Sequence, residues 1–380
     1  MKKIYIIAGE ASGDLHASNL MKSILLMDNS VDFRYWGGDN MQEVKGKPVK
    51  HIRELAFMGF IEVVANLKTI LGNIQFCKKD ILNYQPDAIV LVDYPGFNIR
   101  IAKWAKQKGI PVIYYISPQI WAWKQNRVHT LKKVVDKMLV ILPFEQEFYK
   151  KFGVEVTYVG HPLLDAIEQF KDKAEKVDLY EKHGLDERPV IALLPGSRKQ
   201  EVKVKLPIML ESLANFKDYQ FVIAGAPALP FSFYEPFLSK QKNIHLIHGE
   251  TYDLLSISTA ALVTSGTATL ETALFKVPEV VCYKGSSISY QIAKRLIKVG
   301  YISLVNLILD KEAVRELIQK ECNSSQIEKE LKEILPQGSK LEQVKKDYED
   351  LIQVLGQGGA SQVAAAEVMK VLEGKEKTNL

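Results

Sequence analysis

Residues 4–16 read IYIIAGEASGDLH, a pattern that predicts a strand, a turn and the start of a helix. It begins with an apolar run rich in β-branched residues, as buried strands do. The chain then turns through Gly9 and Gly13 into a segment with helical character. A strand that ends in a small-residue turn before a helix is where α/β proteins bind phosphate groups. The spacing differs from G-x-G-x-x-G, however, and Glu10 adds a carboxylate to the turn.

Short apolar runs alternate with helical segments over most of the chain. In the first half the runs are 4–8, 33–37, 88–93, 111–117, 137–143 and 154–160, and in the second half they are 190–196, 219–225, 243–247, 260–266 and 278–283. The runs are apolar on both faces, which suits strands covered by helices on both sides. The repeated β-α-β order therefore predicts an α/β fold with parallel, doubly wound, Rossmann-like sheets.

The two series of strands are separated by a charged, helical segment at 160–178, which is the expected domain joint. After Tyr301 the pattern becomes helical, with an amphipathic stretch from about Lys311 to Leu355. A glycine-rich break at 356–362 precedes a final short helix. We expect this C-terminal helix to pack back on the N-terminal domain.

The composition is that of an ordinary globular protein of 380 residues, with 47% hydrophobic and 25% charged residues. A net charge of +5 is too small to indicate nucleic acid as a partner. Cys77, Cys282 and Cys322 are far apart and form no C-x-x-C motif, which favours reduced thiols. The N-terminal apolar run is too short for a signal peptide, and no window offers the ~18 uncharged apolar residues of a membrane span. We therefore expect a cytoplasmic protein with peripheral membrane contact and no nucleic-acid partner.

A phosphate-binding site is indicated at 263–278, where the sequence reads VTSGTATLETALFKVP. Small residues separate a strand from a helix here: Ser265, Gly266, Thr267, Ala268 and Thr269. Unpaired backbone N–H groups at the start of that helix, together with the hydroxyls, can bind phosphate. Glu271, one turn further on, can accept hydrogen bonds from a ribose diol. A capped helix packed tightly on its strand would explain the same residues equally well.

A second anion-binding site is indicated at 193–202, LLPGSRKQEV. Gly196 lies in a turn, and Ser197 and Arg198 follow where the next helix begins. Arginine can form a two-point contact with phosphate, although a surface arginine beside a helix cap is the alternative. Two such sites at adjacent strand ends favour one shared ligand, such as a nucleoside diphosphate.

In the first half of the chain, LVDYPGFNIRIAKWA (91–105) places Asp93 at the carboxyl end of a buried strand. Ligand chemistry in open α/β sheets collects at such ends, so Asp93 is a candidate general base. An aspartate that caps the following helix is the equally frequent alternative.

Two stretches have the composition of a membrane-contact surface. Segment 117–133 combines tryptophans with basic residues, and 55–79 contains more apolar side chains than one core-facing helix needs. A core helix is the commoner cause of the second pattern. The residues assigned to membrane or acyl-chain contact are Phe57, Met58, Phe60, Ile61, Val64, Leu67, Trp121, Trp123, Lys124 and Arg127.

Several other motifs are missing from the sequence. There is no G-x-x-x-x-G-K-[ST], no G-x-S-x-G and no metal–nucleotide D-x-D. His245 and His248 lie on an expected strand, where their spacing points the rings to opposite faces. We therefore predict no metal and no cofactor.

Taken together, these stretches resemble the lipid-A-disaccharide synthase family, glycosyltransferases with two Rossmann-like domains (GT-B). The matching segments run in order along nearly the whole chain: GEASGD (9–14), MGFIEV (58–63), VDYPGFN (92–98), ISPQIWAWKQNR (116–127), LPFE (142–145), VGHPLLD (159–165), LLPGSR (193–198), SGTATLE (265–271) and YISLVNLI (301–308). The resemblance implies two domains that face each other across a cleft. They are an acceptor domain, 1–165 with the C-terminal helix 356–380, and a UDP-sugar donor domain, 166–355.

The resemblance also implies the reaction. UDP-2,3-diacylglucosamine would donate its sugar to 2,3-diacylglucosamine 1-phosphate (lipid X), with inversion, to give a β-1,6-linked disaccharide 1-phosphate and UDP. The aspartate that is essential in the family corresponds to Asp93, and the family's arginine corresponds to Arg198 beside the leaving diphosphate. Segment 265–271 would bind the donor's phosphates and ribose, and Asn306 would line the same cleft. Without a metal, Arg198 and the helix N-terminus must neutralise the charge on UDP.

The loop that opens the sequence then has a different role from a dinucleotide site. Gly9, Ser12 and Gly13 would let the backbone approach sugar and diphosphate. Glu10 would orient sugar hydroxyls or, as an equal alternative, fix the loop by local hydrogen bonds. The expected partners are the two acylated sugars and the anionic surface of the inner membrane of a Gram-negative bacterium, with a homodimer as an open alternative to a monomer.

Three rival functions fit the sequence less well. An NAD-dependent oxidoreductase would need the dinucleotide fingerprint that residues 9–14 lack. A non-catalytic two-domain binding protein would normally be exported. A UDP-sugar 2-epimerase shares the two-domain fold but would not need the aromatic-basic segment or the apolar stretch.

Overall fold

A computed structural model describes residues 1–54, 67–173, 179–238, 243–286, 290–291, 295 and 299–378. The chain forms two compact units. Unit 1 consists of Met1–Asp165 and Gln357–Leu380, and unit 2 consists of Ala166–Gly356.

Unit 1 is built on a seven-stranded sheet in the order β3-β2-β1-β4-β5-β6-β7, and every strand pairing in it is parallel. The strands are β1 (Lys3–Ala8), β2 (Asp32–Gly37), β3 (Lys47–His51), β4 (Ala88–Val92), β5 (Val112–Tyr115), β6 (Lys137–Val140) and β7 (Thr157–Tyr158). The helical elements are α1 (Ala11–Met27), α2 (Asp39–Gln42), η1 (Ile52–Glu54), α4 (Leu67–Tyr84), α5 (Pro95–Gln107), α6 (Ile120–Trp123), η2 (Gln125–Arg127), α7 (Val128–Val134), α8 (Phe144–Lys150) and α19 (Ala360–Thr378), while α9 (Pro162–Lys173) leads into unit 2.

Strand β1 shows why the first residues are apolar on both faces. Side chains alternate along a strand, so Ile4 and Ile6 pack in one core while Tyr5 and Ile7 pack in the other. Helices α1 and α19 cover the first face, and α4, α5 and α7 cover the second. The expectation of a doubly wound sheet is confirmed for this unit.

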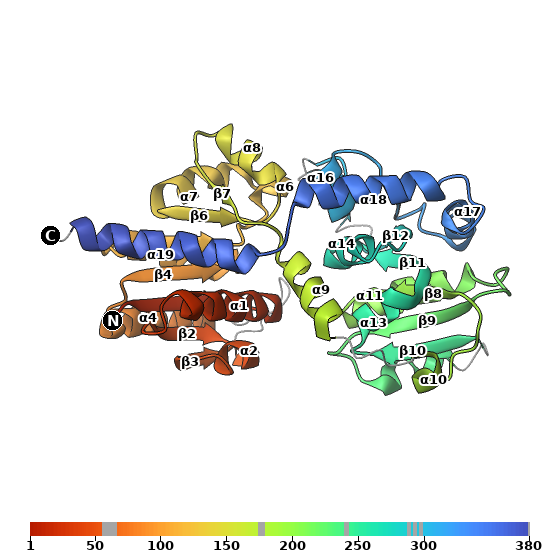
Figure 1. The fold of residues 1–380 in the computed structure, drawn as a ribbon, viewed down its shortest axis with the longest axis horizontal. Coiled ribbons are helices and arrows are strands. Elements are labelled where there is room, and N and C mark those ends of the chain that lie inside the picture. The colour runs from red at the N-terminus through yellow and green to blue at the C-terminus, as the bar shows by residue number, and fades with distance from the viewer. Residues whose placement is uncertain are drawn as a thin grey trace. The chain divides into compact units, whose positions relative to one another are not determined.

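The C-terminal helix α19 packs along α1 within unit 1 (Figure 1). It contributes apolar side chains to the core under β1: Ala364, Ala365, Val368, Met369 and Leu372. Its first turn is capped by the buried carboxylate of Asp165, which accepts hydrogen bonds from the N–H groups of Gly359, Ala360 and Ser361 at 2.5–3.3 Å. The predicted packing of this helix on the N-terminal part of the chain is therefore confirmed.

Unit 2 repeats the architecture with a six-stranded parallel sheet in the order β10-β9-β8-β11-β12-β13. The strands are β8 (Val190–Leu194), β9 (Gln220–Gly225), β10 (Ile244–His248), β11 (Ser258–Thr264), β12 (Glu279–Tyr283) and β13 (Arg315–Ile318). The helical elements are α10 (Leu179–His183), α11 (Lys199–Glu211), η3 (Phe231–Phe233), α12 (Glu235–Leu238), α13 (Thr251–Ile257), α14 (Thr267–Leu274), α16 (Leu304–Leu309), α17 (Ser324–Ile334) and α18 (Leu341–Leu355).

Two strands were missed by the sequence prediction. β13 lies in the stretch predicted to be entirely helical, yet it pairs with β12 from Val280–Arg315 to Tyr283–Ile318. Its residues are mostly helix formers by local propensity, and pairing with the sheet edge overrides that preference. β3 is an exposed or half-buried edge strand with two lysines and a proline, so it lacks the apolar signal of a central strand.

Among the described residues, no helix combines the length and the apolar character that a bilayer crossing would require.

Candidate active site

Both sheets reverse their strand order at one point, and the candidate residues lie there. In unit 1 the reversal falls between β1 and β4, and in unit 2 it falls between β8 and β11. Ligands of open α/β sheets bind outside the carboxyl ends of the strands at such points. The segments that follow these four strands contain Glu10, Asp93, Arg198 and Ser265–Glu271.

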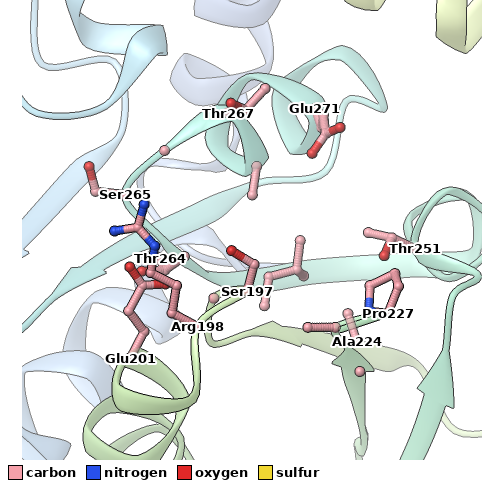
Figure 2. A pocket seen from close by; sticks show the side chains of 16 residues that line it. Ser197, Arg198, Glu201, Ala224, Pro227, Thr251, Thr264, Ser265, Thr267 and Glu271 are labelled. Carbon is pink, nitrogen blue, oxygen red and sulfur yellow. The ribbon is translucent and has the colours of Figure 1, made fainter. Parts of the chain in front are cut away.

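In unit 2 this edge carries a pocket of about 520 Å³. Residues 196–198, which follow β8, form one wall, and residues 264–268, which end β11 and begin α14, form another (Figure 2). Thr251 and Glu271 lie at the opposite end from Arg198 (Figure 2). Thr251 and the β9 residues Ala224 and Gly225 were missed by the sequence prediction, because their small or neutral side chains carry no chemical signal.

Arg198 brings a positive charge to this pocket. It precedes α11 in an extended conformation, and its exposed guanidinium forms no hydrogen bond or ion pair with any residue that the structure describes. Figure 2 shows it on the same side of the pocket as Ser265. Such an unengaged guanidinium is available to an anion. The turn before it requires glycine, because Gly196 has φ +117° and an added Cβ would lie 2.4 Å from Glu201 Oε2.

The start of α14 presents backbone N–H groups to the same pocket. Gly266 is the N-cap residue, with φ +148° and no side chain to cap the helix. The N–H groups of the first turn have no intrahelical partners and carry the positive end of the helix dipole. The hydroxyl of Ser265 instead donates a hydrogen bond to the carbonyl of Ile302 at 2.8 Å.

Thr269 and Asn306 require corrections to the predicted site. Thr269 is fully buried, donating to the carbonyl of Gly266 at 2.8 Å and accepting from the N–H of Leu304 at 3.3 Å. Asn306 is also fully buried, and its amide is used in four hydrogen bonds within unit 2. Both residues fix the 302–316 segment beneath the pocket and are not among the pocket-lining residues.

Glu271 lies one turn into α14 and lines the pocket. Its carboxylate accepts a hydrogen bond from Tyr252 Oη at 3.1 Å, and burial raises the pKa of Glu271. The rings of Tyr252 and Phe275 pack with their centroids 5.2 Å apart, and this contact holds the Tyr252 hydroxyl in position. A half-buried, oriented carboxylate of this kind can accept hydrogen bonds from a sugar diol.

In unit 1, Asp93 follows β4 in an unusual backbone conformation. Asp93 and Tyr94 have φ +44° and +47°, a left-handed region that residues other than glycine rarely adopt. The carbonyl of Asp93 is held by Asn98 Nδ2 at 2.8 Å and by Tyr114 Oη at 2.6 Å. Strain maintained by surrounding contacts is typical of functional sites.

The acidity of Asp93 is perturbed. Burial, and secondarily the Glu10 carboxylate, raise the pKa of Asp93 to about 6. Glu10 is exposed and is the N-cap residue of α1, but its side chain forms no capping hydrogen bond. A carboxylate with this pKa is ionised at neutral pH and is still basic enough to accept a proton.

The glycines of the first loop serve close packing. An added Cβ on Gly9 would lie 2.3 Å from the ring of Tyr94, so this glycine lets the two loops approach. Gly13 packs α1 on β1, with 3.4 Å between its would-be Cβ and Ala8 Cβ. Ser12 is exposed in the first turn of α1.

Asp14 was missed as a structural residue. It is buried, and its carboxylate accepts backbone hydrogen bonds from Gly38, Asn40 and Met41 at 2.6–3.2 Å. This carboxylate therefore links α1 to the start of α2. No sequence pattern showed that the two segments meet.

The predicted membrane-contact residues have different outcomes. Trp121 is only 5% exposed and packs edge-on against Phe144 at 4.9 Å, so its assignment to a surface is wrong. Trp123 is 45% exposed, with Lys124 Nζ 4.1 Å and Arg127 Cζ 5.8 Å from its ring centroid. Leu67 begins α4. The remaining assigned residues lie outside the described part of the chain: Phe57, Met58, Phe60, Ile61 and Val64.

Comparison with known proteins supplies the family. A model of lipid-A-disaccharide synthetase matches residues 4–371. The lipid-A-disaccharide synthase of Syntrophus aciditrophicus (strain SB) is 39% identical over 379 residues, covering 98% of this chain and 98% of the relative. That of Geobacter metallireducens is 37% identical over 382 residues, covering 99% and 98%.

Solved structures show the same fold at low identity. The UDP-GlcNAc 2-epimerase from Neisseria meningitidis, bound to UDP-GlcNAc, matches with a TM-score of 0.68 and 15% identity, covering 97% of this chain and all of the other. The glycotransferase of kitacinnamycin matches with a TM-score of 0.66 and 13% identity, covering 98% and 99%. These similarities show the fold alone. The match to the family model and to curated relatives along nearly the whole length shows that the chain belongs to the lipid-A-disaccharide synthetase family.

Proposed function

We propose that the chain transfers the sugar of UDP-2,3-diacylglucosamine to lipid X with inversion, releasing UDP and the β-1,6-linked disaccharide 1-phosphate. The acceptor's 6-hydroxyl loses its proton as its oxygen bonds to the anomeric carbon, and the bond from that carbon to UDP breaks. The observation that carries the proposal is the pocket of unit 2, where an unengaged arginine and the start of α14 offer positive charge to a diphosphate.

Asp93 is the proposed base. Its pKa of about 6 keeps it ionised at neutral pH, and its position at the strand reversal of unit 1 is where ligands bind in such sheets. Burial, and secondarily the Glu10 carboxylate, keep the pKa of this carboxyl above that of an isolated aspartate. Proton transfer to a positioned base contributes about 10²–10⁴-fold to rate in enzymes generally.

Stabilisation of the leaving group is the second proposed element. Arg198 would contact the diphosphate from one wall while the N–H groups of Thr267 and Ala268 contact it from another. Glu271 would accept hydrogen bonds from the ribose diol. We propose that the reaction needs no metal ion, because these groups together supply the positive charge that departing UDP requires.

The test of this function uses purified protein with both acylated sugars. We expect UDP and a disaccharide 1-phosphate to form together, in equal amounts, and neither to form when lipid X is left out. The products are measured by coupled UDP detection and by mass spectrometry. Conversion of UDP-GlcNAc alone to an epimer, with no disaccharide from the acylated pair, would contradict the proposal.

We further propose that the enzyme works at the anionic cytoplasmic surface of the inner membrane. The supporting feature is the exposed indole of Trp123, flanked by Lys124 and Arg127, since aromatic and basic side chains together suit lipid headgroups. We expect Trp123→Ala to reduce co-sedimentation with anionic phospholipid vesicles several-fold. The matched control is Phe231→Ala, which removes a comparably exposed aromatic ring from unit 2. Equal vesicle binding by wild type and Trp123→Ala would contradict this surface.

A further inference from the structure

A lysine is buried behind the pocket of unit 2. Lys205 lies on the inner face of α11 and is only 3% exposed. Its Nζ donates a hydrogen bond to Oγ1 of Thr264, and no other hydrogen-bond partner of this ammonium is found among the described residues. Buried ammonium groups are normally paired with an anion, because burial of an unpaired charge is unfavourable.

The residues around Lys205 do not neutralise the charge of its ammonium group. The Glu201 carboxylate favours the charged form of Lys205, whereas the Arg198 guanidinium disfavours it. The buried thiols of Cys282 and Cys322 contribute the remaining electrostatic interactions. Burial is the larger influence, and it lowers the pKa of Lys205. Among the described residues, Lys205 forms no ion pair with a carboxylate, and its hydrogen-bond partner is the neutral hydroxyl of Thr264. The arrangement is therefore short of negative charge.

The hydrogen bond between Lys205 and Thr264 has a fixed direction. An ammonium has three donors and no acceptor, so the oxygen of Thr264 must accept. The hydroxyl hydrogen of Thr264 then has to point elsewhere, and no described residue accepts it. Thr264 ends β11 and lines the same pocket as Arg198 (Figure 2).

We propose that Lys205 and Thr264 form a positioning pair for the diphosphate of the donor. Lys205 donates to Thr264, and Thr264 donates its hydroxyl hydrogen to a diphosphate oxygen in the pocket. The bound diphosphate also supplies the negative charge that Lys205 lacks. This inference rests on the proposed function, because it deepens how the same pocket binds the leaving group.

Calorimetry with UDP and with uridine tests the pair directly. We expect Lys205→Met and Thr264→Val to weaken UDP binding about tenfold each, as loss of a hydrogen bond to a charged group does, and to leave uridine binding unchanged. The double variant should bind UDP about as weakly as the weaker single variant, because the two residues act in series. Thr264→Ser, which keeps the hydroxyl, should restore UDP binding. In turnover, the KM of the donor should rise while that of lipid X does not.

The matched control is Lys203→Met, which removes an exposed lysine from the same helix and should change UDP affinity less than twofold. Lys205→Met should unfold at no lower a temperature than wild type, because a buried unpaired charge is replaced by an apolar group of similar length.

The proposed role of Lys205 and Thr264 would be wrong if their variants bound UDP within twofold of wild type. It would also be wrong if uridine binding weakened as much as UDP binding. A wild-type chain that binds no UDP would overturn both this inference and the proposed function. One that binds UDP without forming a disaccharide would overturn the proposed function alone.

Discussion

Asp93→Asn is expected to lower kcat by about 10³-fold while UDP binds as tightly as in wild type. Asparagine preserves the size and the backbone bonds of the turn, but its amide cannot accept the proton of the acceptor hydroxyl. The measurement is steady-state turnover with both acylated sugars, alongside calorimetry of UDP binding. Near wild-type turnover would show that another group is the base, whereas loss of UDP binding would point to a disturbed fold.

The pH dependence of the same reaction provides a second measurement of this base. Since Asp93 must be ionised to act, kcat/KM should fall as the pH drops below the pKa of about 6. Glu10 raises that pKa, so Glu10→Gln should move the acid limb of the profile to lower pH. Glu43→Gln removes another exposed carboxylate of unit 1 and should leave the limb in place. An acid limb that is the same in Glu10→Gln and wild type would contradict the electrostatic link.

Arg198→Met should reduce kcat/KM by about 10²–10³-fold, the range found when a donor to a developing negative charge is removed. UDP affinity should fall as well, because the guanidinium interacts with the diphosphate both before and after the bond to the sugar breaks. Lysine at this position would restore the charge without the two-point geometry, so Arg198→Lys should recover only part of the loss.

The neighbouring Lys199 provides the control for Arg198. It is also exposed and one residue away, but its Nζ lies 5.8 Å from the ring centroid of Phe233, and Lys199 is outside the pocket lining. Lys199→Met should therefore change kcat/KM and UDP affinity little. Unchanged UDP affinity in Arg198→Met would contradict the assignment of this arginine to the diphosphate.

The fold and the strand-end residues were predictable because they follow from local pattern. Apolar runs with small residues at their ends located most strands, and with them Asp93, Arg198 and Glu271. What failed depends on distant segments. Thr269 has the spacing of a phosphate ligand, but its hydroxyl is used by the turn at Gly266 and by Leu304, 35 residues away.

The exposure of the two tryptophans also depends on distant segments, so the sequence alone could not predict it. Trp121 and Trp123 are two residues apart in one short helix, so nothing in the sequence separates them. Phe144, from a different helix, covers the first and leaves the second exposed. The burial of Lys205 was missed for a similar reason. A lysine within a charged helix is expected to be exposed to solvent, and only its neighbours in the fold show that it is buried.

The packing of α19 in the core of unit 1 has a consequence for biosynthesis. The ribosome synthesises residues 166–356 after Asp165 and before α19. The strands of unit 1 are therefore complete before the last helix that covers their sheet has been made. The nascent N-terminal half therefore passes through a stage in which the α1 face of its sheet is incompletely covered, and this face is completed only after residues 166–356 have been synthesised.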